Sequence, residues 1–229
     1  MSLRDYYNTR WQLTQAGGGA NYSDQVSQAK IGAVLRAIGE HKHVLDYGCG
    51  DGQHASMIHK TCSSDVVGVD ISSRAVELAR QRNPALVFHV IEDGKPLPFA
   101  KESFDVVFAG DMIEHVIDVE GLVKEWNRVM KPGGRLIVTT PYHGFVKNVV
   151  IALTCFDRHF NPRGEHIRFF TVRTLRTCLE AAGFRVADIK YRGRIYPLSS
   201  GMMVFARKER DAGIPVRVED GPVAERLGC

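Results

Sequence analysis

The fold of this chain is decided by the stretch Val44-Leu45-Asp46-Tyr47-Gly48-Cys49-Gly50-Asp51-Gly52. It opens with a short apolar run typical of a buried strand, and its glycines allow the backbone to turn sharply and to approach a ligand. A dinucleotide-binding turn has the spacing GxGxxG and seats a pyrophosphate on a helix N-terminus. Here the spacing is GxGxG, and Gln53 stands where the third glycine would be. The turn therefore favours a ligand without pyrophosphate; the alternative is a strand-to-helix connection that is merely tight.

Outward from this turn, short apolar strands alternate with amphipathic helices. The pattern predicts strands at 44–46, 66–70, 86–91, 104–109, 136–140, 186–191 and 202–206. It predicts helices at 24–39, from the glycine turn to about 62, and at 74–82, 119–130 and 172–182. Ser23 and either Ser72 or Ser73 are expected N-caps, and Gly183 is expected to end the last helix. Such alternation predicts a parallel sheet covered by helices on both faces.

Length and composition limit the classes of protein to which the chain can belong. With 229 residues, 44% hydrophobic and 24% charged, it is typical of one globular α/β domain. We expect that domain over 1–207, with an N-terminal lid at 1–25, a substrate-side insertion at 141–170 and a polar tail at 208–229. A net charge of +4 argues against a dominant role as a nucleic-acid coat or as a clamp on a membrane surface, and it leaves a local basic patch open. The sequence does not decide the oligomeric state.

The cysteines and the apolar runs bear on the compartment. Five cysteines without a CxxC pair argue against a disulfide framework or a cysteine zinc site, and they favour a reducing compartment. The first residues lack the apolar core of a signal peptide. The longest apolar run, Val149 to Leu153, is too short to span a bilayer. We therefore expect a cytoplasmic protein without a membrane span.

Two acidic positions follow the second and third predicted strands. Asp70 lies 18 residues after Gly52, where a carboxylate can accept from both hydroxyls of a ribose. Such an aspartate by itself more often caps a helix, but beside the glycine turn the ribose interpretation is favoured. Asp93, followed by Gly94, could accept from an adenine amino group, and Leu97 could pack on the ring.

With these motifs in order, the run from about 42 to 140 resembles the class I S-adenosylmethionine-dependent methyltransferases. The first motif of the family is similar to Asp46–Gly52, its post-fourth-strand motif to 111–116, and its Lys-Pro-Gly-Gly turn to Lys131–Gly134. The resemblance implies a Rossmann-like seven-stranded sheet of order 3-2-1-4-5-7-6, with strand 7 antiparallel, and S-adenosylmethionine as the cofactor. The cofactor-binding residues it implies are Asp46, Gly48, Gly50, Gly52, Asp70, Ile71, Asp93, Gly94, Asp111 and Met112.

A cluster of polar side chains follows the fourth predicted strand. Asp111, Glu114 and His115 are spaced i, i+3 and i+4, so a helical turn would place them on one face. Two carboxylates and an imidazole suit a hard cation, best Mg²⁺ or Mn²⁺. In the alternative, Asp111 shapes a turn, Glu114 forms a local ion pair, and His115 packs or acts as a base.

The segment Gly164–Thr171 resembles a stretch of the ubiquinone-biosynthesis O-methyltransferases. The ExxEH motif of those enzymes is similar to Asp111–His115, from which Asp111 departs as the shorter acid. The small-RNA 3′-end 2′-O-methyltransferases use an ExxEH and a later histidine to hold a metal, and His166 sits in a comparable place. The candidate catalytic residues are Glu114, His115 and His166; the candidate metal ligands are Asp111, Glu114, His115 and His166.

Further candidates lie in the expected N-terminal lid and in the expected substrate-side insertion. Tyr6, Tyr7 and Trp11 could fold over the cofactor, since an aromatic face beside a sulfonium is favourable, or could simply anchor the lid to the core. The candidate substrate contacts in the insertion are Tyr142, His143, Arg158 and His159; for each alone, a solvated loop residue is the plainer interpretation.

The leading functional hypothesis is a small-molecule O-methyltransferase whose acceptor is a quinol or catechol, a sugar or a natural-product hydroxyl. RNA 2′-O-methylation is an alternative that a pI near 8.8 permits. The modest net charge and the lack of an RNA-binding appendage count against a nucleic-acid partner. A non-catalytic cofactor-binding subunit is a third hypothesis, and a nicotinamide oxidoreductase is disfavoured by the glycine spacing.

Overall fold

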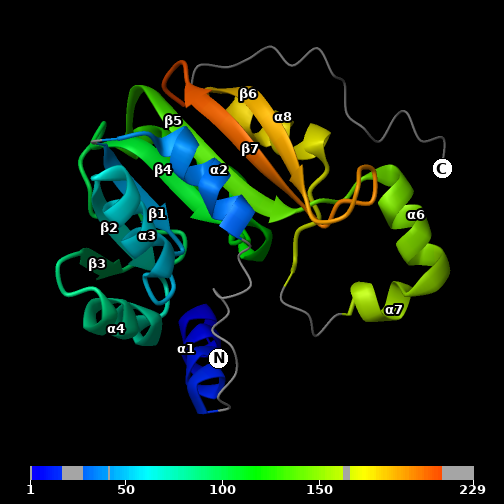
Figure 1. The fold of residues 1–229 in the computed structure, drawn as a ribbon, viewed down its shortest axis with the longest axis horizontal. Coiled ribbons are helices and arrows are strands. Elements are labelled where there is room, and N and C mark those ends of the chain that lie inside the picture. Colours follow the sequence, from blue (N-terminus) through cyan, green and yellow to red (C-terminus); the bar gives the residue numbers. More distant parts are fainter. Residues whose placement is uncertain (1, 17–27, 41, 162–165, 213–229) are drawn as a thin grey trace.

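The computed structural model describes residues 2–16, 28–40, 42–161 and 166–212. Its centre is one seven-stranded sheet of order β3-β2-β1-β4-β5-β7-β6, in which β7 runs antiparallel to both neighbours and the other pairs are parallel (Figure 1). This confirms the fold class and strand order expected from the sequence. The strands are β1 (His43–Tyr47), β2 (Asp65–Asp70), β3 (Val87–Val90), β4 (Phe104–Gly110), β5 (Met130–Pro141), β6 (Phe184–Arg192) and β7 (Gly201–Lys208).

Helices cover both faces of the sheet, and two separate apolar clusters fill the space beneath them. Neighbouring residues of one strand point to opposite faces: Val106 packs under α2, α3 and α4, whereas Val107 packs under α5 and α8. The described helices are α1 (Leu3–Ala16), α2 (Gln28–Ile38), α3 (Gln53–Cys62), α4 (Ser73–Arg82), the 3-10 turn η1 (Ile113–His115), α5 (Val119–Val129), α6 (Phe145–Thr154), α7 (Phe156–His159) and α8 (Val172–Ala181).

Local signals set the ends of several of these elements. Ser72, not Ser73, caps α4, because its hydroxyl accepts from the Ala75 backbone N–H at 3.1 Å. After α8 the chain reverses at Gly183, whose φ of +88° is favourable only for glycine. The expected cap Ser23 lies outside the described residues. Strand β5 begins at Met130, earlier than the predicted 136, because Met130 already pairs with Phe104 across an irregular register.

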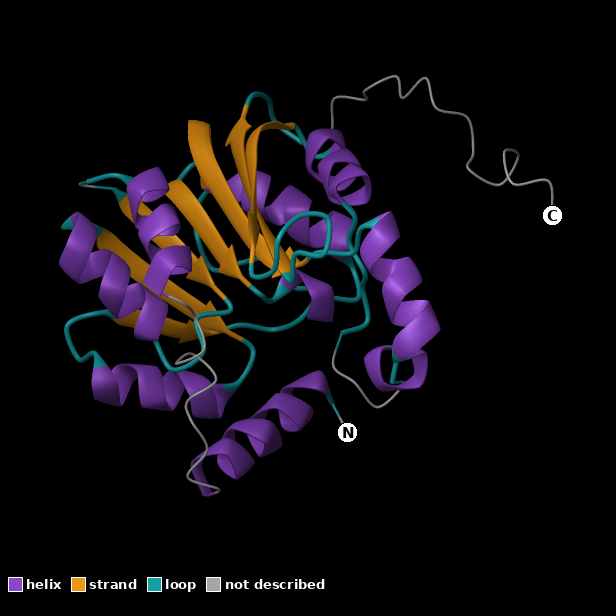
Figure 2. Ribbon diagram, turned by 45° about the vertical axis from the view of Figure 1, so that its right-hand side comes forward, coloured by secondary structure: helices purple, strands orange, loops and turns teal. Residues whose placement is uncertain are grey.

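The segments flanking the sheet differ in part from expectation. Residues 145–159 of the insertion form α6 and α7, which stand out from the body of the domain (Figure 2). Lys208, expected in the polar tail, is buried at the end of β7, where its Nζ donates to the carbonyls of Asn127 and Met130 at 2.9 and 3.0 Å. The rest of that tail, from 213, and residues 17–25 of the predicted lid lie outside the described residues. Among the helices that the structure describes, none is long and apolar enough to cross a membrane.

Candidate cofactor and acceptor site

The glycine turn forms the floor of a cavity at the carboxyl edge of the sheet. Gly48 and Gly50 have φ of +76° and +53°, a region that side chains with a Cβ rarely adopt. The backbone N–H groups of Gly48 and Cys49 both donate to the Val69 carbonyl, at 2.8 and 3.0 Å, which ties the turn to β2. A Cβ added at Gly50 would lie 2.9 Å from the Trp11 ring. The backbone is therefore held close to whatever fills the space between the turn and α1.

The cavity is lined by the ends of β1, β2 and β4 and by α1. Ten of the residues that line it are candidates named from the sequence: Tyr7, Trp11, Gly48, Gly50, Asp70, Ile71, Asp93, Asp111, Met112 and His115. Asp70 and His115 both line it, so one continuous cavity connects the end of β2 with η1. The arrangement supports an adenosyl group beside Asp70 and a reacting group beside His115.

Asp70 lies at the end of β2, on the wall of this cavity. One carboxylate oxygen accepts from the Gly50 N–H at 2.9 Å and the other from the Ser72 N–H at 2.8 Å. A carboxylate offers about four lone-pair sites, so both oxygens can still accept from hydroxyls of a ligand. Burial raises the pKa of Asp70 because the carboxylate has lost water that would stabilise its charge. Hydrogen-bond donors of a ligand would replace that water.

Asp46 lies behind the turn rather than in the cavity. Its side chain is buried, and its Oδ2 has no hydrogen-bond partner among the described residues. Burial, followed by the charges of Asp70 and Asp51, raises the pKa of Asp46 to about 7, against a lowering by the Ala55 backbone N–H. The first-motif acid of this chain thus lies beneath the turn, near the Ala55 backbone N–H, and does not line the cavity; the sequence alone did not separate this position from direct cofactor contact.

The Asp46→Asn variant is expected to unfold with a different pH dependence. Because the pKa rises on folding, from 3.8 to about 7, the contribution of Asp46 is fully favourable below pH 4 and is lost as pH rises through 7. At 1.36 kcal/mol per pKa unit, the variant should be more stable than wild type by roughly 2–4 kcal/mol at pH 8 and nearly equal at pH 4. Urea unfolding at both pH values measures this, and parallel stability curves would contradict it.

Three other predicted cofactor residues have packing or turn roles in the structure. Gly52 does not line the cavity: with φ of +79° it precedes α3, and a Cβ there would lie 2.9 Å from both Asn83 and Phe88. Gly94, at φ of +69°, turns the chain beside Asp93 without lining the cavity. Leu97 lies in the core, and Ile71 and Ile91 supply the apolar wall near Asp70 instead.

Helix α1 covers the cavity and is fastened to the start of α4. The Asn8 side-chain oxygen accepts from the hydroxyls of Ser72 and Ser73, at 2.8 and 3.3 Å, and from the Arg74 backbone N–H at 3.2 Å. Tyr7, Arg10 and Trp11 of this helix line the cavity, while Tyr6 packs edge-on against Tyr7. Of the predicted lid, residues 3–16 are thus a helix over the cavity, and its role as a lid stays a prediction.

Asp111 does not share a helical face with Glu114 and His115. Its φ of +50° breaks the chain direction after β4, so only the short turn η1 follows. The Asp111 backbone N–H donates to the Thr139 carbonyl at 2.9 Å, and its carboxylate accepts from the Thr139 hydroxyl at 3.0 Å and pairs with Arg192 at 2.9 Å. The predicted i, i+3, i+4 geometry was therefore wrong, because it assumed a regular helix from 111.

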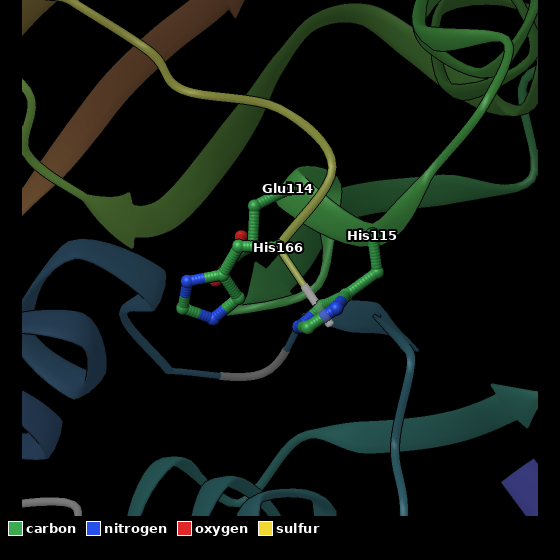
Figure 3. Close-up of side chains that lie close together, drawn as sticks. All are labelled: Glu114, His115 and His166. Atoms are coloured by element: carbon green, nitrogen blue, oxygen red, sulfur yellow. The ribbon is translucent and has the colours of Figure 1, made fainter. Parts of the chain in front are cut away.

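Glu114, His115 and His166 do come together (Figure 3). One potential ligand atom from each lies within 4.8 Å of the others, and Asp111 is not part of this group. The Glu114 carbonyl accepts from the N–H groups of Ile167 and Arg168, both at 3.0 Å, which brings the later segment to η1. The Glu114 carboxylate is buried and accepts from the Thr140 hydroxyl at 2.9 Å. The rings of His115 and His166 are 5.1 Å apart between centroids.

Burial favours the neutral form of both imidazoles of this group. Burial, then the charges of His166 and Arg10, lowers the pKa of His115 to about 4, although Asp111 raises it. Burial also lowers the pKa of His166. A neutral imidazole can accept a proton or bind a metal ion through its free nitrogen.

The four predicted substrate residues lie beyond the cavity. Tyr142 and His143 are buried, and Arg158 and His159 are exposed on α7. The His143 ring stands 5.4 Å from that of His159 and 5.0 Å from that of Phe169. These contacts attach α7 to the segment that carries His166. None of the four residues lines the cavity, so their substrate roles stay predictions.

Sequence reasoning did not single out Arg10 or Arg192. Arg10 lines the cavity from α1, and Arg192 reaches Asp111 from the end of β6, 81 positions away in the sequence. No local motif marks either arginine. Only the strand order, which places β6 and β7 beyond β5, indicates that the end of β6 lies on the same edge as Asp111.

The comparisons agree with this geometry. A family model described as a methyltransferase domain matches residues 45–138, the part that holds the glycine turn, Asp70 and the cluster at 111–115. Residues 45–138 therefore match a methyltransferase domain, in agreement with the class I resemblance found in the sequence. A S-adenosylmethionine-dependent methyltransferase of known structure from Methanosarcina mazei is 21% identical, with a TM-score of 0.62, over 77% of this chain and 96% of that one. At that identity it supports the fold of the domain.

Two curated relatives extend the similarity beyond the domain match. The ubiquinone biosynthesis O-methyltransferase of Coxiella burnetii is 29% identical over 155 residues, which cover 65% of this chain and 65% of that protein. The biotin biosynthesis bifunctional protein of Cellvibrio japonicus is 29% identical over 210 residues, which cover 85% of this chain and 41% of the relative. The chain thus spans less than two thirds of the length of these relatives.

Proposed function

We propose that this methyltransferase domain transfers a methyl group from S-adenosylmethionine to a hydroxyl group of a small molecule. The observation that carries the proposal is that His115 lines the same cavity as the glycine turn and Asp70, with potential ligand atoms of Glu114 and His166 within 4.8 Å of its own. Similarity to O-methyltransferases, including one from Penicillium expansum at 29% identity, supports oxygen as the accepting atom.

The residues fit S-adenosylmethionine better than a dinucleotide. Asp70 offers an anchored carboxylate for the ribose, Ile71 and Ile91 offer an apolar wall, and the glycine turn leaves room that any Cβ at Gly50 would fill. When bound, the cofactor supplies a methyl group activated by a sulfonium. The chain would orient the acceptor against that group, exclude water under α1 and take up the hydroxyl proton.

The group formed by Glu114, His115 and His166 offers two routes for that proton. In the first, the neutral imidazole of His115 or His166 accepts the proton directly. In the second, Glu114, His115 and His166 hold a divalent ion, which would lower the pKa of a bound hydroxyl. Two imidazoles and one carboxylate suit Mn²⁺ better than Mg²⁺, which prefers oxygen ligands. With Asp111 paired to Arg192, we propose the three-residue set and Mn²⁺ for the metal route.

The proposal is tested by measuring S-adenosylhomocysteine release with a panel of catechols, quinols, sugars and a short RNA. A small-molecule hydroxyl is expected to raise the release rate well above the rate without acceptor. In the metal route, a chelator should lower that rate, and Mn²⁺ should restore it more fully than Mg²⁺. Release only with RNA would reassign the acceptor. Tight cofactor binding without release on any acceptor would support a non-catalytic subunit instead.

A further inference from the structure

The surface of α6 is unusual because its exposed side chains are apolar. Phe145 is 84% exposed and Leu153 is 81% exposed, and the helix contains no acidic residue. Their spacing places them on one face with the valines between them. A monomer rarely exposes a contiguous apolar patch of this kind without a partner. The exposed apolar face consists of Phe145, Val146, Val149, Val150 and Leu153, continued by Phe156 at the start of α7.

The loop between β6 and β7 adds a second apolar projection beside the start of α6. Ile195 is 90% exposed, and Tyr196 is also exposed. Lys147 of α6 donates to the carbonyl of Ser200 at 3.4 Å, and the Tyr196 ring lies 6.4 Å from that of Tyr142, just before the helix. Figure 1 shows this loop reaching the upper end of α6, away from the body of the sheet.

Positive charge accompanies the apolar side chains. Arg158 is exposed just after Phe156, and Arg194 is exposed just before Ile195. Burial, together with the charges of Arg192 and Arg194, lowers the pKa of Lys147, as expected near a concentration of positive charge. Between 141 and 160 the sequence contains one acidic residue, Asp157, and between 191 and 200 it contains none.

We propose that α6 and the β6–β7 loop form a docking surface for an anionic lipid bilayer. Exposed apolar side chains insert at the level of the headgroups, where tyrosine is also favoured, and arginines at the edge pair with anionic headgroups. The charge argues against a second copy as the occupant, since pairing this surface with itself would bring Arg158 and Arg194 of two copies toward like charges. This surface lies outside the cofactor cavity, so its role is independent of the function proposed above.

The test is sedimentation of the full chain with vesicles of phosphatidylcholine alone and of phosphatidylcholine mixed with phosphatidylglycerol. We expect stronger binding to the anionic vesicles, and weaker binding as salt is added. Each of Phe145→Gln and Leu153→Gln should weaken binding roughly tenfold or more, from the apolar area lost. Arg158→Gln and Arg194→Gln should each cost roughly fivefold, and only with anionic vesicles.

Leu13→Gln is the matched control, because Leu13 is an exposed leucine on the separate helix α1. It should bind vesicles as wild type does, and every variant should keep the wild-type melting temperature. The proposal is overturned if wild type does not sediment with anionic vesicles, or if Phe145→Gln and Leu153→Gln sediment as wild type does. A dimer in solution that these two substitutions dissociate, without vesicle binding, would assign the surface to contact between copies.

Discussion

Replacing Asp70 with alanine is expected to weaken the binding of S-adenosylmethionine at least about 100-fold. The Asp70 carboxylate would accept two charge-assisted hydrogen bonds from the ribose, each contributing about 1.5–3 kcal/mol. It also fixes the N–H groups of Gly50 and Ser72, so its loss loosens the turn beneath the ligand. Isothermal titration calorimetry with the cofactor measures the effect directly.

Asp93→Ala is the graded comparison. Asp93 lines the same cavity but is exposed, so the loss of its contact with a neutral amino group should lower the cofactor affinity less than about tenfold.

Because Gln53 replaces the third glycine of a dinucleotide turn, wild type should show no binding of NAD in the same titration. Wild-type affinity in Asp70→Ala, with the melting temperature unchanged, would remove the adenosyl group from this end of the cavity.

The positions of most strands and helices along the chain could be predicted from the sequence because they rest on local patterns. Apolar runs such as Val66–Val69 read as buried strands, and Gly183 and Ser72 mark helix ends by their own conformational preferences. The order of the strands in the sheet and the antiparallel direction of β7 came from the family resemblance, not from any property of the strands themselves. The structure confirms both.

The geometry around Asp111 could not be predicted in the same way. A positive φ at an aspartate leaves no mark in the sequence, and the spacing i, i+3, i+4 is the same whether the turn is regular or broken. Its partner Arg192 is distant along the chain, so the ion pair that Asp111 forms, apart from the candidate ligands Glu114, His115 and His166, depends on tertiary structure. His166 was placed correctly beside His115 only through the resemblance.

The exposed face of α6 is a third case. The sequence of an apolar run such as Val149–Leu153 does not distinguish a buried helix from an exposed one. Hydrophobicity alone would assign it to the core, whereas in the structure only Ile151 of this helix is buried. Exposure is decided by what packs against a helix, and α6 stands apart from the sheet (Figure 2). This is the reason the docking surface could be inferred only from the structure.

Loss of the imidazole that takes up the proton, by alanine at His115 or at His166, is expected to lower the rate of methyl transfer by roughly 10²–10⁴-fold, the usual range for a lost general base. Cofactor affinity should change little in His166→Ala, since His166 does not line the cavity. The effect should therefore appear in the turnover number measured at saturating cofactor. His59→Ala is the control, because His59 is exposed near the far end of α3, where its Nδ1 lies 2.9 Å from the Ser64 carbonyl oxygen.

The double variant separates the two routes for the proton. If both imidazoles hold one ion, either single substitution disables the site, so His115→Ala with His166→Ala should be little slower than each alone. Both single variants should then also lose affinity for Mn²⁺, which can be measured without an acceptor. If one imidazole acts as the base, only that substitution should slow turnover strongly. Full turnover in both single variants would exclude Glu114, His115 and His166 as the group that takes up the proton. Only the proposed cofactor contacts would then remain.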